Sequence, residues 1–223
     1  KAWPLPWTQF TRYYLRGERS GSAGSPNDGT LSLEAPGDEA PDTLSYDPHA
    51  PDLPGSIGLR SLAVGANNPG SDQRHDEASG FVLTYTTPVL DDDIEVTGPI
   101  TVELYASGTA VDQDWVAHLT RVHADGTSWL TTDGMLKASH RASHSDPEPV
   151  TPGEVYRLEI EVWATSQLFR KGERIRLDLM NATFPKVEPC PYPSTNRVYH
   201  DATRPSCIVL PIIPRDSGGV WME

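Results

Sequence analysis

The sequence predicts an all-β fold, a jelly-roll-like antiparallel β-sandwich. Several segments alternate apolar and polar residues with a period of two, the pattern of strands with one buried face. The 21 prolines and 18 glycines punctuate these segments, as in the turns DGT at 125–127 and PGE at 152–154. No segment shows the periodicity of a long amphipathic helix. Together these three observations favour a sandwich of short strands.

The strand prediction rests first on three segments that alternate over their whole length: residues 156–163, 100–107 and 174–179. In the last of these, Arg176 and Asp178 belong to the polar set, on the face opposite the buried one. Shorter candidate strands are 11–15, 30–33, 81–86, 115–123, 135–141 and 207–213.

The whole chain, residues 1–223, is predicted to be a single β-sandwich domain, because sandwiches routinely reach this length as one unit. Two segments do not fit the strand pattern. Residues 17–29 form a polar loop rich in glycine and serine, and residues 47–71 are irregular although they carry apolar side chains. A loop as long as 47–71 inside a compact domain is usually functional or covers another surface.

Composition excludes several classes of partner. With 18 basic and 31 acidic side chains the net charge is −13, so nucleic acid and anionic membrane surfaces are repelled. No apolar run approaches the roughly 20 residues that span a bilayer. The chain opens without an initiator Met or a signal peptide, so we expect a fragment of a larger, cytoplasmic protein. Cys190 and Cys207 are expected to be free thiols.

The segment SDQRHDEASG at 71–80 contains the residue types of a serine hydrolase triad. Ten consecutive residues rarely supply a triad, because its side chains must arrive from different directions. A G-x-S-x-G nucleophile elbow is also missing, and SGSAG at 20–24 lacks the strand and helix that the motif requires. Cys207 lies in the apolar run CIVLPII, where an inert thiol is expected. We therefore predict no catalytic residue in this chain.

Metal and cofactor sites are not predicted either. His140 and His144 have the spacing of zinc ligands on a helix, but they fall in a strand and a turn. His118 and His123 would point to opposite faces of one strand. The acidic runs at 91–93 and 112–114 lack the spaced oxygens of a calcium loop and are interpreted as solvated turns.

Trp163 and Tyr105 fall on the polar phases of their strands, so their rings are expected to face outward. Outward aromatic rings on a sandwich suit either a surface covered by another domain or a platform that stacks on sugars. Covering by another domain is the favoured interpretation, because exposed apolar surface commonly marks an interaction site.

A series of longer motifs occurs in one order along nearly the whole chain. They are SDQR, VLTYTTPVLDDDIEVTGPITVELYAS, DWVAHLTRVHADGTSWLTTDGMLKASHR, PGEVYRLEIEVWATSQLFRKGERIRLDLMNATFP and RVYHDATRPSCIVLPIIP. Together they resemble the C-terminal domain of X-prolyl dipeptidyl peptidases and the related cocaine esterase-type acyl hydrolases. The resemblance implies a galactose-binding-domain-like sandwich attached to an α/β-hydrolase domain, which carries the serine triad and binds a small acyl or peptide substrate.

The resemblance also implies roles for particular residues. Asp72 and Arg74 match the family's DQR motif and are interpreted as a structural anchor. Residues 1–10 are interpreted as the linker to the hydrolase domain. The apolar residues expected at a domain interface or pocket wall are Ile57, Leu59, Leu62 and Val64. A free-standing carbohydrate-binding sandwich remains the alternative function, and homo-oligomer formation is left open.

Overall fold

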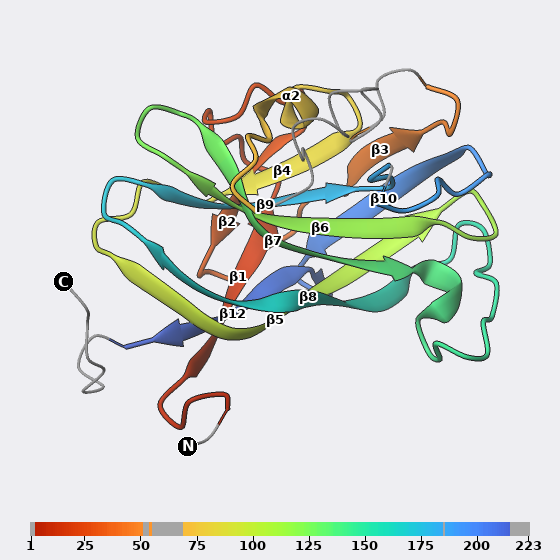
Figure 1. The fold of residues 1–223 in the computed structure, drawn as a ribbon. Helices are drawn as coiled ribbons and strands as arrows, with labels where there is room; N and C mark the ends of the chain where they lie inside the picture. Colours follow the sequence, from red (N-terminus) through yellow and green to blue (C-terminus); the bar gives the residue numbers. More distant parts are fainter. Residues whose placement is uncertain (1–2, 51–53, 55–68, 185, 215–223) are drawn as a thin grey trace.

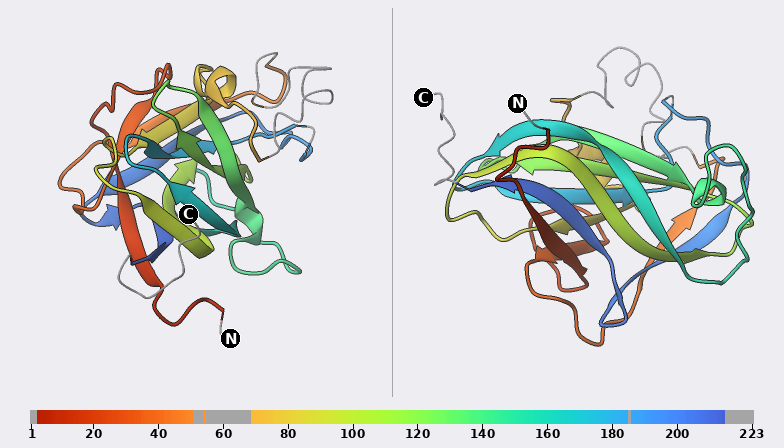
Figure 2. Two further views of the ribbon diagram at one scale, coloured as in Figure 1. Left: turned by 60° about the vertical axis from the view of Figure 1, so that its left-hand side comes forward. Right: turned by 90° about the horizontal axis from the view of Figure 1, so that it is seen from below.

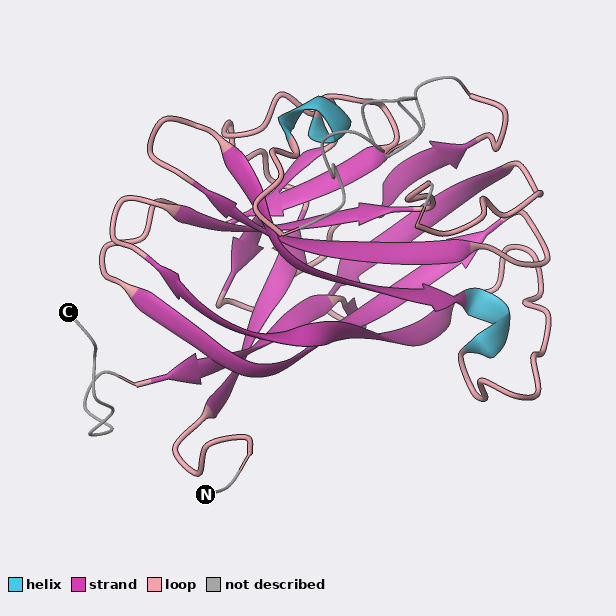
Figure 3. Cartoon of the chain, in the orientation of Figure 1, coloured by secondary structure: helices cyan, strands magenta, loops and turns pink. Residues whose placement is uncertain are grey.

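The computed structural model describes residues 3–50, 54, 69–184 and 186–214. Within these residues the regular structure is almost all strand, joined by loops and turns, with one short α-helix and one turn of 3-10 helix, so the all-β prediction is confirmed (Figures 1 and 3). No helix in this part of the chain has the length and apolar character to cross a membrane. The elements are β1 (Gln9–Arg16), β2 (Asp28–Ser32), β3 (Asp42–Tyr46), α2 (Arg74–Glu77), β4 (Val82–Thr86), β5 (Ile94–Gly108), β6 (Asp114–Val122), β7 (Ser128–Lys137), η1 (Ala138–His140), β8 (Tyr156–Phe169), β9 (Arg174–Met180), β10 (Ser194–Asp201), β11 (Arg204–Pro205) and β12 (Cys207–Ile213).

The strands form a closed hydrogen-bonded ring in the order β5-β12-β1-β2-β4-β9-β6-β7-β8, and β8 returns to β5. The long strands β5 and β8 run side by side as a bent antiparallel pair (Figure 2). By contrast, β7 and β8 meet at a single antiparallel position, Gly134 opposite Val162. Strand β10 lies outside the ring, where it pairs with β5, β3 and β11.

One pairing corrects the purely antiparallel prediction. Strands β2 and β4 run parallel, with Asp28, Gly29 and Thr30 opposite Thr84, Tyr85 and Thr86. The physical reason is the connection between them, because residues 33–81 are long enough to cross the domain and return in the same direction.

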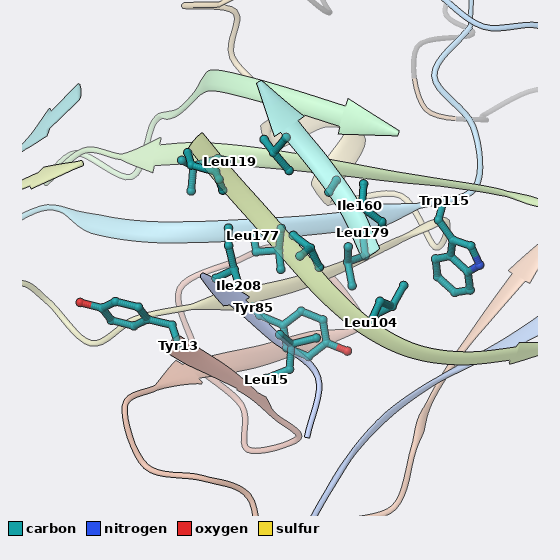
Figure 4. Packing of buried hydrophobic residues seen from close by; sticks show 14 of the residues in the cluster. Tyr13, Leu15, Tyr85, Leu104, Trp115, Leu119, Ile160, Leu177, Leu179 and Ile208 are labelled. Atoms are coloured by element: carbon teal, nitrogen blue, oxygen red, sulfur yellow. The ribbon is translucent and has the colours of Figure 1, made fainter. Parts of the chain in front are cut away.

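The core fills the inside of the ring. Apolar residues at every second position of β5, β6, β8 and β9 point inward and meet side chains from β1 and β12 (Figure 4). Fully buried examples from five strands are Leu104, Leu119, Ile160, Leu177 and Ile208. Burying each such side chain contributes about 1.5–3 kcal/mol, so the alternating pattern directs the strands to close around this core.

Most predicted strands are confirmed, including 156–163, 100–107 and 207–213, each of which lies within one element. The prediction for 135–141 is wrong in part, because β7 ends at Lys137 and the chain turns into η1. Strands β3 and β10 are not predicted by the alternation. DTLSY is short, with Leu44 and Tyr46 buried on one face, and STNRVYHD is largely polar.

Strand β9 also departs from the expected one-sided burial. Arg176 and Asp178, which the alternation places opposite the core, are each 1 % exposed. Helix α2 lies above β4 and β9 in Figure 1 and covers this outer face of the ring. The outer face of β9 is therefore buried by a segment distant in sequence. The periodicity of a strand gives no information about such a covering segment.

Candidate domain-docking face

The segment that precedes α2 is fastened to β7 through its backbone. Leu130 accepts a hydrogen bond from the N–H of Gly70 at 2.7 Å, and its own N–H donates to the carbonyl of Ser71 at 2.9 Å. The N–H of Gln73 donates to the Ser128 carbonyl at 2.7 Å. These three bonds extend the sheet by a short edge, so the C-terminal end of the long irregular segment has a definite position.

Asp72 and Arg74, the predicted anchor, form an ion pair within this edge. The Arg74 Nε donates to Asp72 Oδ1 at 3.0 Å and to Oδ2 at 2.9 Å, and the Arg74 N–H donates to Oδ1 at 3.1 Å. These hydrogen bonds, led by the side-chain bond from Arg74, lower the pKa of Asp72. Both side chains are substantially exposed, so the pair shapes the turn while the backbone bonds to β7 hold it.

The N-terminal end of the same segment is fastened on the other side, by β3. This strand pairs with β10 along its full length, and the hydroxyl of Tyr46 at its end donates to the Cys190 carbonyl at 2.7 Å. Tyr46, Ala182 and Cys190 form a small buried cluster against which Ala50 packs. Ile57, Leu59, Leu62 and Val64, the predicted interface residues, lie outside the described residues, between these two fastened ends.

Helix α2 is held to the sheet by a buried ion pair that the sequence pattern does not reveal. The Glu77 carboxylate accepts hydrogen bonds from Arg176 of β9 and from the Ser128 hydroxyl of β7. Arg176 also donates to the Thr86 hydroxyl at 2.8 Å and to the Ser22 carbonyl at 3.0 Å. Burial raises the pKa of Glu77, and the positive charge of Arg176 opposes that shift. One guanidinium thus connects α2, β4, β9 and the loop before β2.

Sequence reasoning missed this pair because neither partner stands out. Glu77 lies in a run of polar residues, and Arg176 occupies the polar phase of an alternating strand. The nearest signal is the DQR motif, which ends just before Glu77. The neighbouring His75, one of the triad-type residues in the segment 71–80, is exposed.

A second polar feature crosses the outer face of the ring, the face that α2 covers. Thr84, Asp178, His118 and Asp133 stand opposite one another on β4, β9, β6 and β7. Burial raises the pKa of Asp178 well above its ordinary value, with the nearby charge of Glu77 adding to the effect. Burial lowers the pKa of His118 to about 4, although Asp133 opposes this. Burial therefore favours the neutral form of both groups, and a pKa of about 4 makes the His118 ring neutral at pH 7.

The rim of this face carries exposed apolar side chains. Trp129, Met135 and Phe184 are 45 %, 37 % and 41 % exposed. Trp129 packs edge-on against His123, with ring centroids 4.5 Å apart. A covered polar centre with an apolar rim is suited to contact with another protein surface.

The two cysteines behave as structural residues. Cys190 and Cys207 are both free and buried, as predicted, and burial raises the pKa of Cys207 to about 11. A thiol with such a pKa is not a nucleophile at neutral pH. Across residues 3–50, 54, 69–184 and 186–214, no three or more His, Cys, Asp or Glu side chains come together in a group that could hold a metal ion.

The fold and this face define an accessory all-β domain. The chain belongs to the family of X-Pro dipeptidyl-peptidase C-terminal non-catalytic domains, whose family model matches residues 1–209. The resemblance found in the sequence motifs is therefore confirmed.

Individual relatives agree with this assignment. The chain is 37 % identical to cocaine esterase of Rhodococcus sp. (strain MB1 Bresler), over 96 % of this chain and 39 % of that protein. Among solved structures, an aminopeptidase from a marine sediment Thaumarchaeota archaeon superposes with a TM-score of 0.83 at 22 % identity, over 96 % of this chain and 38 % of that one. An α-amino acid ester hydrolase superposes with a TM-score of 0.78 at 23 % identity, over 91 % of this chain and 36 % of that one. The chain thus spans less than two-fifths of the length of these relatives.

Proposed function

We propose that this chain is the C-terminal part of a serine hydrolase that transfers peptide, ester or amide acyl groups to water. The α/β-hydrolase domain of the same polypeptide supplies the nucleophile, base and oxyanion hole. Family membership supports this, as does the length of relatives such as the cocaine esterase, of which this chain covers 39 %. In this proposal the present domain is a jelly-roll-like, galactose-binding-domain-like sandwich with no catalytic residue of its own.

The structural part of the proposal rests on one observation: both ends of the segment before α2 are hydrogen-bonded to strands. One end is tied to β10 through β3, and the other to β7 through residues 70–73. Fixing both ends of a segment lowers the entropic cost of presenting its apolar side chains to a partner surface. We assign that role to Ile57, Leu59, Leu62 and Val64, with Asp72 and Arg74 shaping the turn at its end.

Residues 1–10 connect the two domains in this proposal, and β1 begins at Gln9, near the end of that connection. The chain then enters the core strand whose residues Tyr13 and Leu15 are buried. The hydrolase domain would accordingly be tethered close to the N-terminal end of β1.

The test is the double substitution Leu59→Ser/Leu62→Ser in the full-length enzyme. Complete burial of a leucine contributes about 1.5–3 kcal/mol, so even half-burial against substrate or the hydrolase domain changes an affinity several-fold. We expect KM to rise several-fold, or the two domains to separate more readily, while the thermal unfolding midpoint of the β domain hardly changes.

The matched control is Leu33→Ser, at an exposed leucine after β2. This substitution should leave both KM and domain association unchanged. If the double variant instead unfolds the β domain and leaves the kinetics of the folded fraction intact, the two leucines are core residues and the pocket-wall role is wrong.

A further inference from the structure

A groove lies on the outer surface of the ring, next to the docking face, with which it shares Met135. Its volume is about 760 Å³, and it runs between η1 with the turn after it and the outer face of β8. Met135, His140 and Ala142 line one side, and Glu159, Glu161 and Trp163 line the other. In Figure 1, η1 and the turn after it stand at one end of β7 and β8.

The groove exists because β7 and β8 separate after one backbone-paired position, Gly134 opposite Val162. A Cβ atom at Gly134 would overlap the Glu161 carbonyl oxygen and lie 2.7 Å from the Cα of Val162, so only glycine allows the strands this close. From this point β7 continues into η1, whereas β8 stays paired with β5. The divergence leaves part of the β8 surface open along its outer face.

Trp163 and Glu161 form the most exposed polar and aromatic pair of the groove. They are two positions apart on β8 and therefore point to the same side. The Trp163 side chain is 76 % exposed, the highest value among the large hydrophobic residues described. Within the described residues Glu161 has no ion pair, whereas Glu159 lies 3.5 Å from Arg157.

The arginine that lines the groove, Arg141, is already engaged. Arg141 donates to the Glu148 carbonyl at 2.6 Å, and its guanidinium lies 4.5 Å from the centroid of the Tyr156 ring. Its side chain is only 16 % exposed. The negative charge of Glu161 is therefore not neutralised by Arg141, and an exposed indole lies beside it.

We propose that this groove binds an arginine side chain presented by an extended peptide segment. A guanidinium is planar and weakly hydrated, so it can stack on the Trp163 indole while its N–H groups donate to the Glu161 carboxylate. Met135 and Ala142 would contact the aliphatic part of the same side chain. The chain's net charge of −13 favours the approach of a basic segment.

The proposal is tested on the 223-residue chain with a capped Gly-Arg-Gly tripeptide, followed by NMR of the tryptophan indole N–H signals. Trp163→Phe identifies the signal of Trp163. We expect this signal to shift in a saturable manner and the affinity to fall as salt increases. A tripeptide with citrulline in place of arginine has nearly the same shape without the charge, and it should not bind.

Two variants locate the site. Glu161→Gln, followed by the Trp163 signal, and Trp163→Ala, followed by isothermal titration calorimetry because it lacks that signal, should each weaken binding about two- to five-fold. A cation on an exposed ring and an exposed ion pair contribute little more than that. Both side chains are exposed, so the thermal midpoint should stay the same. Glu18→Gln removes an equivalent exposed charge outside the groove and should leave binding unchanged.

Three results would overturn the proposal. One is equal binding of the citrulline and arginine tripeptides. Another is unchanged affinity in Glu161→Gln. The third is a saturable shift of the Trp163 signal with a neutral trisaccharide but not with the arginine tripeptide, which would assign the groove to sugars and favour a carbohydrate-binding function.

Discussion

The carboxylate of Glu77 and the guanidinium of Arg176 form an ion pair across 99 residues of sequence, with side chains only 3 % and 1 % exposed. Removing one partner leaves a buried charge without compensation, which typically costs about 3–5 kcal/mol. We expect Glu77→Gln to lower the free energy of unfolding by about this amount in a urea titration. The double variant Glu77→Leu/Arg176→Met should lose less free energy of unfolding than Glu77→Leu and Arg176→Met lose in total when each is made alone. A loss below about 1 kcal/mol for Glu77→Gln would show that the pair does not hold α2 in place.

Asp178 leads to a prediction about pH, because burial raises its pKa well above the ordinary value. In the unfolded chain the carboxyl ionises near pH 4, whereas burial in the folded protein favours its neutral form to higher pH. Its contribution to stability is therefore complete below the unfolded pKa and is lost progressively as the pH rises toward the folded pKa. Asp178→Asn should remove this loss and stabilise the protein more at pH 8 than at pH 5. Parallel stability curves for the variant and the parent chain between these pH values would contradict this assignment.

His200 should give the protein a second pH dependence. Its buried ring lies between two carboxylates, with Nε2 3.1 Å from Asp42 Oδ2 and Nδ1 3.2 Å from Glu39 Oε2. Burial alone would lower the pKa of His200, but the hydrogen bond and charge of Asp42, with the charge of Glu39, raise it overall. Asp42 also accepts a hydrogen bond from the Tyr85 hydroxyl at 2.7 Å, and Arg16 pairs with Glu39.

The stabilisation by charged His200 is complete below the unfolded pKa and is lost as the pH rises through the folded pKa. We therefore expect the parent chain to lose stability relative to His200→Gln between about pH 6 and pH 9, since free histidine titrates near 6.5. Chemical denaturation at several pH values measures this difference. If the parent chain instead gains stability relative to His200→Gln as the pH rises, His200 is neutral in the folded protein.

Gly134 should be intolerant of substitution, because it allows the one backbone-paired position that closes the ring between β7 and β8. In Gly134→Ala the added methyl group would overlap the backbone of Glu161, and such overpacking typically costs about 1–3 kcal/mol. Gly80→Ala is the control, since a Cβ there meets nothing within 4 Å. Equal thermal midpoints for the two variants would show that the ring tolerates separation at this point.

Much of the architecture is local in origin and could be read from the sequence. Alternation over 156–163 and 100–107 predicted β8 and β5 correctly, because a strand with one face in the core must place apolar side chains at every second residue. The outward position of Trp163 follows from the same rule and is confirmed by its 76 % exposure. Strands β3 and β10 escaped detection because β3 is only five residues long and β10 is largely polar, although Leu44 and Val198 lie in the main buried cluster.

The sequence by itself determined most of the strand content and the family motifs, whereas the free state of Cys190 and Cys207 is shown by the structure. Tertiary structure alone decided which polar side chains are buried. Arg176 and Asp178 have the pattern of outward residues, and they are buried because α2 covers β9 from a position 99 residues earlier in the chain at the Glu77–Arg176 pair. Periodicity reports which face of a strand meets the core, but it contains no information about what packs on the other face. That is decided by long-range pairing, where a desolvated charge such as that of Arg176 requires a partner of opposite charge brought there by the fold.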